Sequence, residues 1–316
     1  MDKSLNLIEG QPLAEVAATI AQAFDDAALF FGHGTDNAAD ESIWLICSAL
    51  GIGYAESNWQ ERLQAALERP ATGDEIKTIG ALADARIVTR KPLAYLIGEA
   101  WFAGLRFDID ESVLVPRSPI ATLITEGFAP WMQQPLKAKV LDLCTGSGCI
   151  GIATAMYFPD WQVDLSDISQ EALNIARLNV AAYDLTERVR VIESDVLESP
   201  LLSTYDLIVT NPPYVDQVEM DARPDEFRRE PELGLAAGAD GLDIVRDILA
   251  SAAECLNPLG VLICEVGASE PALQAAYPEV PFTWLTIYDD SQGIFVIDRE
   301  TLIQFDAVFQ ARRSRT

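Results

Sequence analysis

The chain has 316 residues, enough for a large core and two domains, and its composition, 49% hydrophobic and 22% charged, is that of a globular protein. Its 49 acidic and 22 basic residues give a formal net charge of −27, which argues against direct binding of duplex DNA and favours a basic protein partner. No run of 18 apolar residues and no signal-like start occur, so we expect a cytoplasmic protein without a membrane span.

Residues 1–94 are predicted to form a small helical domain, because residues 13–24, 41–50 and 61–70 show helical periodicity between loop signals. Residues 95–118 are rich in aromatic and β-branched side chains around two glycines, which predicts a β-hairpin linker. The five cysteines are scattered without C-x-x-C spacing and His33 is the only histidine, so neither a metal site nor a disulfide framework is expected.

Residues 119–316 alternate between strand and helix patterns, which indicates parallel strands with crossover helices on both faces. The last two strands lie close together in sequence and predict an antiparallel hairpin at one edge. The fold class is therefore a doubly wound, seven-stranded, Rossmann-like α/β sheet with an antiparallel edge hairpin, preceded by the helical domain. The expected strands are 139–144, 162–167, 188–195, 205–211, 260–267, 282–289 and 293–298, with helices at 149–158, 170–183 and 242–256.

A glycine-rich loop follows the first of these strands, in "VLDLCTGSGCIGIA" at residues 140–153. Gly146, Gly148 and Gly151 satisfy the G-x-G-x-x-G dinucleotide fingerprint, which is weak evidence by itself. Asp142 ends the strand just before the glycines, where a carboxylate would repel a pyrophosphate but attract an ammonium group. The loop therefore favours S-adenosylmethionine over NAD.

Two further carboxylates end the next two predicted strands. Asp167 can accept hydrogen bonds from both ribose hydroxyls, and Asp195 is placed to meet an adenine amino group. Because the carboxyl ends of parallel strands share one edge of the sheet, the three carboxylates form a consistent ligand track.

The fourth strand ends at Asn-Pro-Pro-Tyr, residues 211–214, where two prolines prevent the strand from continuing. The Asn211 side-chain carbonyl and the Pro212 backbone carbonyl can each accept an N–H from an amide or aromatic amine. They would hold its nitrogen in line with a methyl donor by fixed dipoles, without a general base before transfer. Tyr214 can pack against the planar substrate group.

These motifs resemble those of known enzyme families. "DLCTGSG" followed by "NPPY" resembles the amino-methyltransferases that use S-adenosylmethionine. "FGHGTDN" at 31–37, the linker at 94–120 and "EPELGLAAGADGL" at 230–242 together look like the protein-glutamine N5-methyltransferase family. Within it, the linker is similar to the branch that modifies ribosomal large-subunit protein three rather than the branch that acts on release factors. The match runs from about residue 30 to residue 298.

The resemblance implies methyl transfer to the side-chain nitrogen of a glutamine in a basic ribosomal protein, with residues 1–94 recognising that substrate. One departure from the family pattern is Cys144, where many relatives have glycine. The catalytic residues implied are Asn211, Pro212 and Tyr214. The substrate-binding residues implied are the same three together with Pro213. The cofactor-binding residues implied are Asp142, Cys144, Thr145, Gly146, Gly148, Asp167, Ile168, Asp195, Val196 and Asn211.

Several alternatives stay open. A release-factor methyltransferase fits the same motifs, as does an adenine-N6 DNA methyltransferase, although the latter lacks a basic target-recognition region. A dehydrogenase rests on the glycine spacing alone, and a non-enzymatic assembly factor is compatible with every motif. The acidity itself could serve only solubility. Residues 219–232 are either a solvated loop or a substrate-contacting lip, and Arg117 is either a buried structural cation or a residue near the cofactor. The oligomeric state is not predicted.

Overall fold

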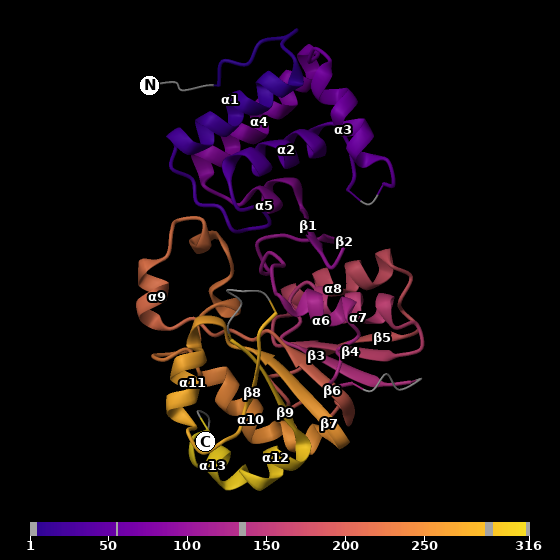
Figure 1. The fold of residues 1–316 in the computed structure, drawn as a ribbon, viewed down its shortest axis with the longest axis vertical. Coiled ribbons are helices and arrows are strands. Elements are labelled where there is room, and N and C mark those ends of the chain that lie inside the picture. The colour runs from indigo at the N-terminus through magenta and orange to yellow at the C-terminus, as the bar shows by residue number, and fades with distance from the viewer. Residues whose placement is uncertain (1–4, 55, 133–136, 288–292, 314–316) are drawn as a thin grey trace. The chain divides into compact units, whose positions relative to one another are not determined.

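The computed structural model describes residues 5–54, 56–132, 137–287 and 293–313 (Figure 1). Their contacts divide the chain into two compact units. We call Met1–Glu111, Val115–Arg117 and Pro224–Arg229 the helical unit. The rest, Ser112–Leu114, Ser118–Arg223 and Glu230–Thr316, is the sheet unit. Within the described ranges, no helix is both long and apolar enough to cross a membrane.

The helical unit is built from amphipathic helices. Helix α1 buries Leu13, Val16, Ile20 and Phe24 along one face, at the three- and four-residue spacing that a helix packed on one side requires. Helix α4 starts at a capping box, in which the Thr72 hydroxyl accepts from the Glu75 N–H and the Glu75 carboxylate accepts from the Thr72 N–H. The helices of this unit are α1 (Leu13–Asp26), α2 (Ala38–Ala49), α3 (Trp59–Glu68), α4 (Gly73–Thr89) and α5 (Leu93–Ile97).

A short antiparallel hairpin follows these helices. Strands β1 (Glu99–Phe102) and β2 (Leu105–Asp108) pair with Phe102 opposite Leu105. The two residues between them, Ala103 and Gly104, have φ values of 49° and 76°. Two successive residues with positive φ are the signature of the tight turn that matches the twist of a hairpin.

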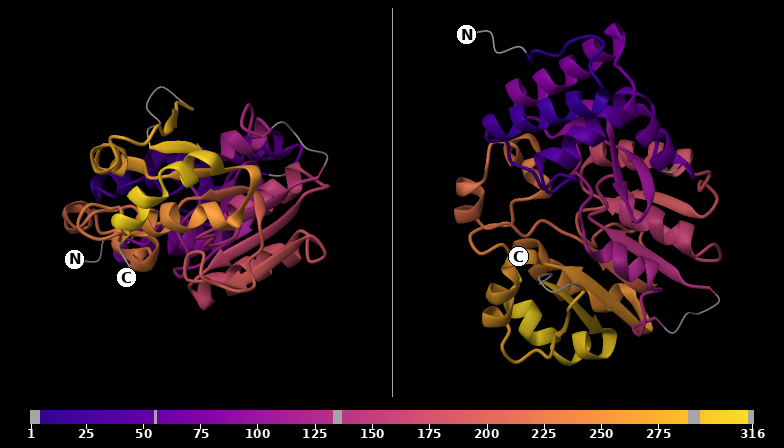
Figure 2. Two further views of the ribbon diagram at one scale, coloured as in Figure 1. Left: turned by 90° about the horizontal axis from the view of Figure 1, so that it is seen from below. Right: turned by 45° about the horizontal axis from the view of Figure 1, so that its top comes forward.

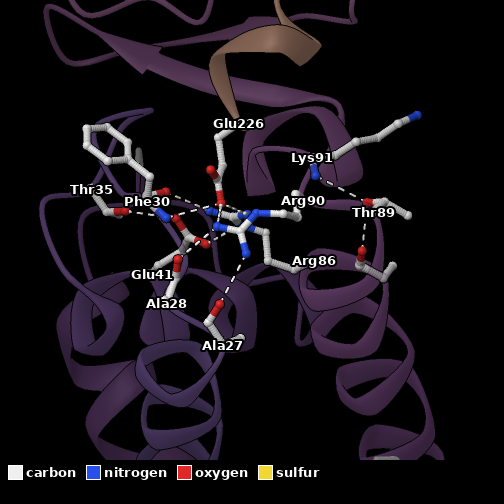
Figure 3. Close-up of polar contacts among 11 residues, drawn as sticks. Ala27, Ala28, Phe30, Thr35, Glu41, Arg86, Thr89, Arg90, Lys91 and Glu226 are labelled. Atoms are coloured by element: carbon white, nitrogen blue, oxygen red, sulfur yellow. Dashed lines mark hydrogen bonds and ion pairs between the residues drawn. The ribbon is translucent and has the colours of Figure 1, made fainter. Parts of the chain in front are cut away.

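The helical unit also contains a buried ion network that includes a residue from far along the chain (Figure 3). Arg86 and Glu226 are fully buried and Glu41 is nearly so. The Arg86 Nε donates to Glu41 Oε1 at 2.6 Å, and its Nη1 lies 3.6 Å from Glu226 Oε1. The same Glu226 oxygen lies 2.7 Å from Arg90 Nη2 and accepts from the Phe30 N–H at 3.1 Å. Residues 224–229 are thus an integral part of the helical unit.

The sheet unit contains the predicted seven-stranded sheet, in the order β5-β4-β3-β6-β7-β9-β8. The first five strands are parallel, β9 is antiparallel to β7, and β8 lies at the edge, antiparallel to β9. The predicted fold class is therefore confirmed. The strands are β3 (Lys139–Leu143), β4 (Gln162–Asp167), β5 (Val189–Glu193), β6 (Tyr205–Thr210), β7 (Leu256–Glu265), β8 (Thr283–Leu285) and β9 (Ile294–Asp298).

Two strands differ clearly from their predictions. β8 ends at Leu285, whereas the sequence predicts a strand over 282–289, of which residues 288 and 289 lie outside the described residues. β7 begins at Leu256, whereas the sequence predicts a start at residue 260. Leu256 pairs with Tyr205, but the next aligned pair is Leu207 with Val261, so β7 contains an irregularity that includes Pro258. The irregular stretch contains Pro258 and Gly260. Because these residue types are common in turns, the sequence pattern predicts a turn there.

Helices cover both faces of the sheet (Figures 1 and 2). Helices α6, α7 and α8 pack together, and α10, α12 and α13 pack together on the opposite face. The chain moves in one direction from β3 to β4 and in the other from β6 to β7, so the strand order reverses between β3 and β6. Ligands bind at such a switch point, beyond the carboxyl ends of the strands. The helices are α6 (Ile120–Thr125), α7 (Cys149–Tyr157), α8 (Gln170–Ala182), α9 (Gln217–Ala222), α10 (Asp243–Cys255), α11 (Glu270–Ala276), α12 (Arg299–Gln304) and α13 (Asp306–Ala311).

Candidate functional site

The candidate site lies at the carboxyl edge of the parallel strands. Asp142 is the fourth residue of β3, Asp167 ends β4, and Asp195 and Asn211 follow β5 and β6. These four strands are neighbours in the sheet, so the fold places the four residues along one edge. Their roles toward ligands stay predictions.

The glycine loop after β3 has three residues in the left-handed region, Cys144, Gly146 and Gly148, with φ values of 58°, 55° and 84°. A Cβ on Gly148 would also lie 2.9 Å from the Ile152 side chain. A non-glycine residue in this region costs about 1 to 2 kcal/mol, so position 144 favours glycine on conformational grounds. Burial raises the pKa of the Cys144 thiol, which therefore stays protonated.

Gly151, the third glycine of the fingerprint, is required by the packing of helix α7 against the sheet. A Cβ on Gly151 would lie 2.1 Å from a Leu165 methyl group and 2.9 Å from the Asp142 Cβ. Gly151 therefore allows helix α7 to approach strands β3 and β4 closely. This close approach accounts for the G-x-G-x-x-G spacing without a bound pyrophosphate.

Asp142 is fully buried, and its two carboxylate oxygens are in different environments. Oδ2 accepts from the Thr145 hydroxyl at 2.5 Å and from the Gly151 N–H at 2.8 Å. Oδ1 has no hydrogen-bond partner within the described part of the chain. Burial raises the pKa of Asp142 to about 7, although the two hydrogen bonds oppose this rise. An unsatisfied buried carboxylate oxygen is a strong acceptor for a cationic donor, because the ion pair would remove its desolvation cost.

Asp167 fixes the glycine loop to the end of β4. Its Oδ2 accepts from the Gly146 N–H and its Oδ1 from the Ser169 N–H, both at 2.9 Å. Each oxygen keeps a second lone pair for a ligand hydroxyl. Burial raises the pKa of Asp167. The next side chain, Ile168, is 47% exposed and offers an apolar surface beside the carboxylate.

The loop after β5 contains a second strained position. Val196, directly after Asp195, is buried and has a φ of 48°. A positive φ is unusual for a β-branched residue, and such strain clusters where a loop is shaped for a ligand. The Ser194 hydroxyl donates to the Val196 carbonyl at 2.7 Å and holds this conformation.

The Asn-Pro-Pro-Tyr segment has one free side chain and one fixed side chain. The Asn211 side chain is partly exposed and makes no hydrogen bond within the described ranges. Tyr214 is held firmly: its hydroxyl donates to Glu265 Oε1 at 3.2 Å, and its carbonyl accepts from the Ser269 hydroxyl at 2.7 Å. A Cβ on Gly267 would lie 2.5 Å from the tyrosine ring, so the ring packs directly on that glycine.

Two residues that the sequence patterns did not reveal support this tyrosine: Glu265 contacts it directly, and Ser118 contacts Glu265. Glu265 ends β7 and is 5% exposed, and its Oε2 accepts from the buried Ser118 hydroxyl at 2.5 Å. Glu265 stands at the end of an apolar strand, as the predicted aspartates do, and that position was the available signal. Ser118 belongs to "VPRS" and comes into contact with Glu265 only through the fold.

The structure decides two of the open alternatives: whether Arg117 is a buried cation, and whether residues 219–232 are a solvated loop. Arg117 is exposed, with its guanidinium carbon 5.5 Å from the centre of the Phe227 ring, so the buried-cation interpretation is wrong. Residues 219–232 are not simply a solvated loop, because Glu226 is fully buried in the ion network of the helical unit.

Comparison with known proteins agrees with this geometry. The family described as the methyltransferase small domain matches residues 124–225, nearly all of which lie in the sheet unit. The ribosomal protein uL3 glutamine methyltransferase of Neisseria gonorrhoeae is 45% identical over 281 residues, which are 89% of this chain and 92% of that protein. The protein of the same name from Bordetella pertussis is 42% identical over 298 residues, 94% of this chain and 98% of that protein. The chain belongs to the ribosomal protein uL3 glutamine methyltransferase family, and the predicted resemblance is confirmed.

The methyl donor of this enzyme class is S-adenosylmethionine, and the site fits it. The unpaired Oδ1 of Asp142 suits an ammonium group, and the Asp167 oxygens suit ribose hydroxyls. Ile168 and the Asp195–Val196 loop would then meet the adenine, and the turn at Cys144, Thr145, Gly146 and Gly148 would follow the methionine part.

We expect Asp167→Ala to weaken binding of S-adenosylmethionine roughly 10- to 100-fold, because charge-assisted hydrogen bonds to the ribose contribute about 1.5 to 3 kcal/mol. Titration calorimetry measures the dissociation constant. Asp184→Ala is the control, since that aspartate lies in the turn after α8. Unchanged affinity in Asp167→Ala would contradict the assignment, as would tighter binding of NAD than of S-adenosylmethionine by the wild type.

Proposed function

We propose that this protein transfers a methyl group from S-adenosylmethionine to the side-chain amide nitrogen, N5, of a glutamine in the large-subunit ribosomal protein uL3. The observation that carries this proposal is the Asn-Pro-Pro-Tyr segment at the end of β6, between the glycine loop of β3 and Glu265 of β7. The names of the relatives, which match nine-tenths of the chain, support uL3 over release factors as the substrate.

The chemical difficulty is that an amide nitrogen is a poor nucleophile, since its lone pair is delocalised into the carbonyl. When bound, S-adenosylmethionine supplies a methyl group made electrophilic by the attached sulfonium. The Asn211 side-chain carbonyl and the Pro212 carbonyl would each accept one N–H of the glutamine amide. They orient the nitrogen toward the methyl group and stabilise the positive charge that develops on it. As the glutamine nitrogen gains the methyl group, the carbon–sulfur bond would break with its electron pair left on sulfur as a neutral thioether, and the nitrogen would then lose a proton to water.

The surrounding residues keep this amide clamp rigid. The rings of Pro212 and Pro213 fix φ at both residues, and Tyr214 is fixed by Glu265 and Ser269. Side chains that are already held lose little entropy when the substrate binds. We infer further that the helical unit recognises the substrate and that the sheet unit carries out methyl transfer, with residues 224–229 and most of the predicted linker 95–118 belonging to the helical unit. A ribosomal protein substrate also implies a cytoplasmic location.

The direct test is to incubate purified uL3 with the enzyme and isotope-labelled S-adenosylmethionine, and then to locate the label by mass spectrometry. We expect one labelled methyl group on a glutamine side chain. A release factor and an adenine-containing DNA duplex are assayed in parallel. Label on either of these, with none on uL3, would overturn the proposed substrate.

The net charge of −27 predicts a salt effect on the same reaction. Ribosomal proteins are basic because they bind RNA, so long-range attraction should speed the encounter, and salt screens it as the Debye length falls from about 10 Å at 0.1 M to about 3 Å at 1 M. We expect kcat/KM for uL3 to fall markedly as salt rises while kcat stays nearly constant. Initial rates over a salt series measure this, with circular dichroism as the folding control. A flat or rising profile would instead support acidity for solubility alone.

A further inference from the structure

The helical unit contains an open pocket of about 490 Å³ that the proposed chemistry does not use. Aromatic side chains from three different segments line it: Trp44 on α2, Tyr54 and Trp59 before and at the start of α3, and Trp101 on β1. Two carboxylates, Asp36 and Asp40, complete the lining together with smaller apolar side chains. Every lining residue belongs to the helical unit, so the pocket is a property of that unit alone.

The rings are arranged edge to face around Tyr54. Its ring centre lies 4.9 Å from that of Trp59 and 5.6 Å from that of Trp101, with interplanar angles of 71° and 89°. Tyr54, Trp59 and Trp101 are all partly exposed. Rings that meet at steep angles do not stack, so part of each π face stays available to a ligand. Aromatic faces attract cations, and tryptophan does so most strongly.

The two carboxylates that line the pocket have no basic side-chain partner among the described residues. Asp36 and Asp40 are exposed, and neither forms an ion pair with a basic residue of the described chain. The Asp40 Oδ2 accepts only from the Asn37 side chain, at 2.8 Å. By contrast, Glu99 and Asp108 on the nearby hairpin both pair with Arg106. The pocket therefore keeps two carboxylates for an external cation.

Two of the lining indoles carry unsatisfied donors. The Nε1–H groups of Trp44 and Trp101 are buried and have no acceptor among the described residues. Trp44 is only 5% exposed.

We propose that this pocket binds a lysine or arginine side chain of the protein substrate. A basic side chain combines the required features: a cation for the aromatic faces and carboxylates, and an aliphatic stem for the apolar walls. A phosphate-bearing or acidic ligand is excluded by Asp36 and Asp40. The inference rests on the proposed function, since a ribosomal protein supplies many such side chains, and it adds a specific docking site to the long-range attraction.

The first test compares two pairs of substitutions that remove the same charge. We expect Asp36→Asn/Asp40→Asn to raise KM for uL3 about tenfold, with kcat and the affinity for S-adenosylmethionine unchanged. The control, Asp25→Asn/Asp26→Asn, removes two exposed carboxylates at the end of α1 and should change KM less than about twofold. Trp59→Ala should raise KM to a similar extent as the first pair, and Trp59→Phe should recover most of the loss. Equal KM values in the two double variants would overturn the proposal.

The second test does not depend on methyl transfer. A capped peptide of alternating glycine and arginine is titrated into the protein by calorimetry, with the same peptide containing citrulline as the control. We expect the arginine peptide to bind more tightly to the wild type than to Asp36→Asn/Asp40→Asn, and the citrulline peptide to bind neither. If the wild type fails to methylate uL3 but shows this pattern, the proposed substrate is wrong and the pocket stands. If methylation succeeds and the peptide binds both proteins equally, the pocket proposal is wrong.

Discussion

Replacing Asn211 with alanine should lower kcat for methyl transfer by about 10² to 10³ and leave the affinity for S-adenosylmethionine nearly unchanged. This is the loss expected when one fixed dipole is removed from a transition state. The structure gives a reason to expect so clean a separation. The Asn211 side chain makes no hydrogen bond within the described part of the chain, so its removal breaks no internal hydrogen bond. The loss should therefore fall on the chemical step.

Single-turnover rates measure the chemical step, and calorimetry measures cofactor binding. Asn174→Ala is the matched control, because Asn174 is an exposed asparagine on α8 of the same unit. We expect the control to retain wild-type turnover. An Asn211→Ala enzyme that binds cofactor and methylates uL3 at a near-wild-type rate would show that the carbonyl of this asparagine does not orient the amide.

Glu226→Ala should destabilise the helical unit by about 3 to 5 kcal/mol, because it leaves Arg86 in the interior with one of its two anionic partners missing. A domain is typically stable by only about 5 to 15 kcal/mol in total, so this loss is large. The substitution also removes the acceptor of the Phe30 N–H and the ion pair with Arg90. Several buried groups lose their partner at once.

The neighbouring acid supplies the control. Asp225 is 62% exposed and its ion pair with Arg228 is long, at 3.8 Å, so Asp225→Ala should cost no more than about 1 kcal/mol. Hydrogen exchange of the α2 and α4 amides reports the opening of the helical unit directly. Similar exchange rates in the two variants would show that the Glu226 network does not stabilise the unit.

The sequence predicts the sheet well because each strand is a short apolar run that ends at a polar or proline residue. The same rule placed Asp142, Asp167, Asp195 and Asn211 on one edge, since parallel strands end together. The strand pattern did not reveal which carboxylate oxygen of Asp142 is unpaired. Its Oδ2 is occupied by Thr145 and Gly151, and only Oδ1 is unpaired, a distinction that depends on side-chain geometry.

Contacts between residues far apart in the chain could not be predicted in this way. The hydrogen bond between Ser118 and Glu265 joins residues 147 positions apart, and no periodic sequence pattern indicates it. Glu226 lies in a stretch of mixed charge that reads as solvent-exposed, because a buried glutamate is indistinguishable from a surface glutamate until its partner is known. The irregularity in β7 was hidden for a related reason, since Pro258 and Gly260 are common in turns.

The burial of Glu226 has a consequence for the order in which the protein is made. Glu226 accepts a hydrogen bond from a residue 196 positions earlier, Phe30, in the unit that leaves the ribosome first. At about 5 to 20 residues per second, the chain needs roughly 10 to 40 s to reach Glu226 after Phe30 has been added. From the addition of Arg86 until that of Glu226, the Arg86 guanidinium has only Glu41 as a buried anionic partner among the described residues. Although the helices begin the chain, their interior is completed only after strands β3 to β6 have been synthesised.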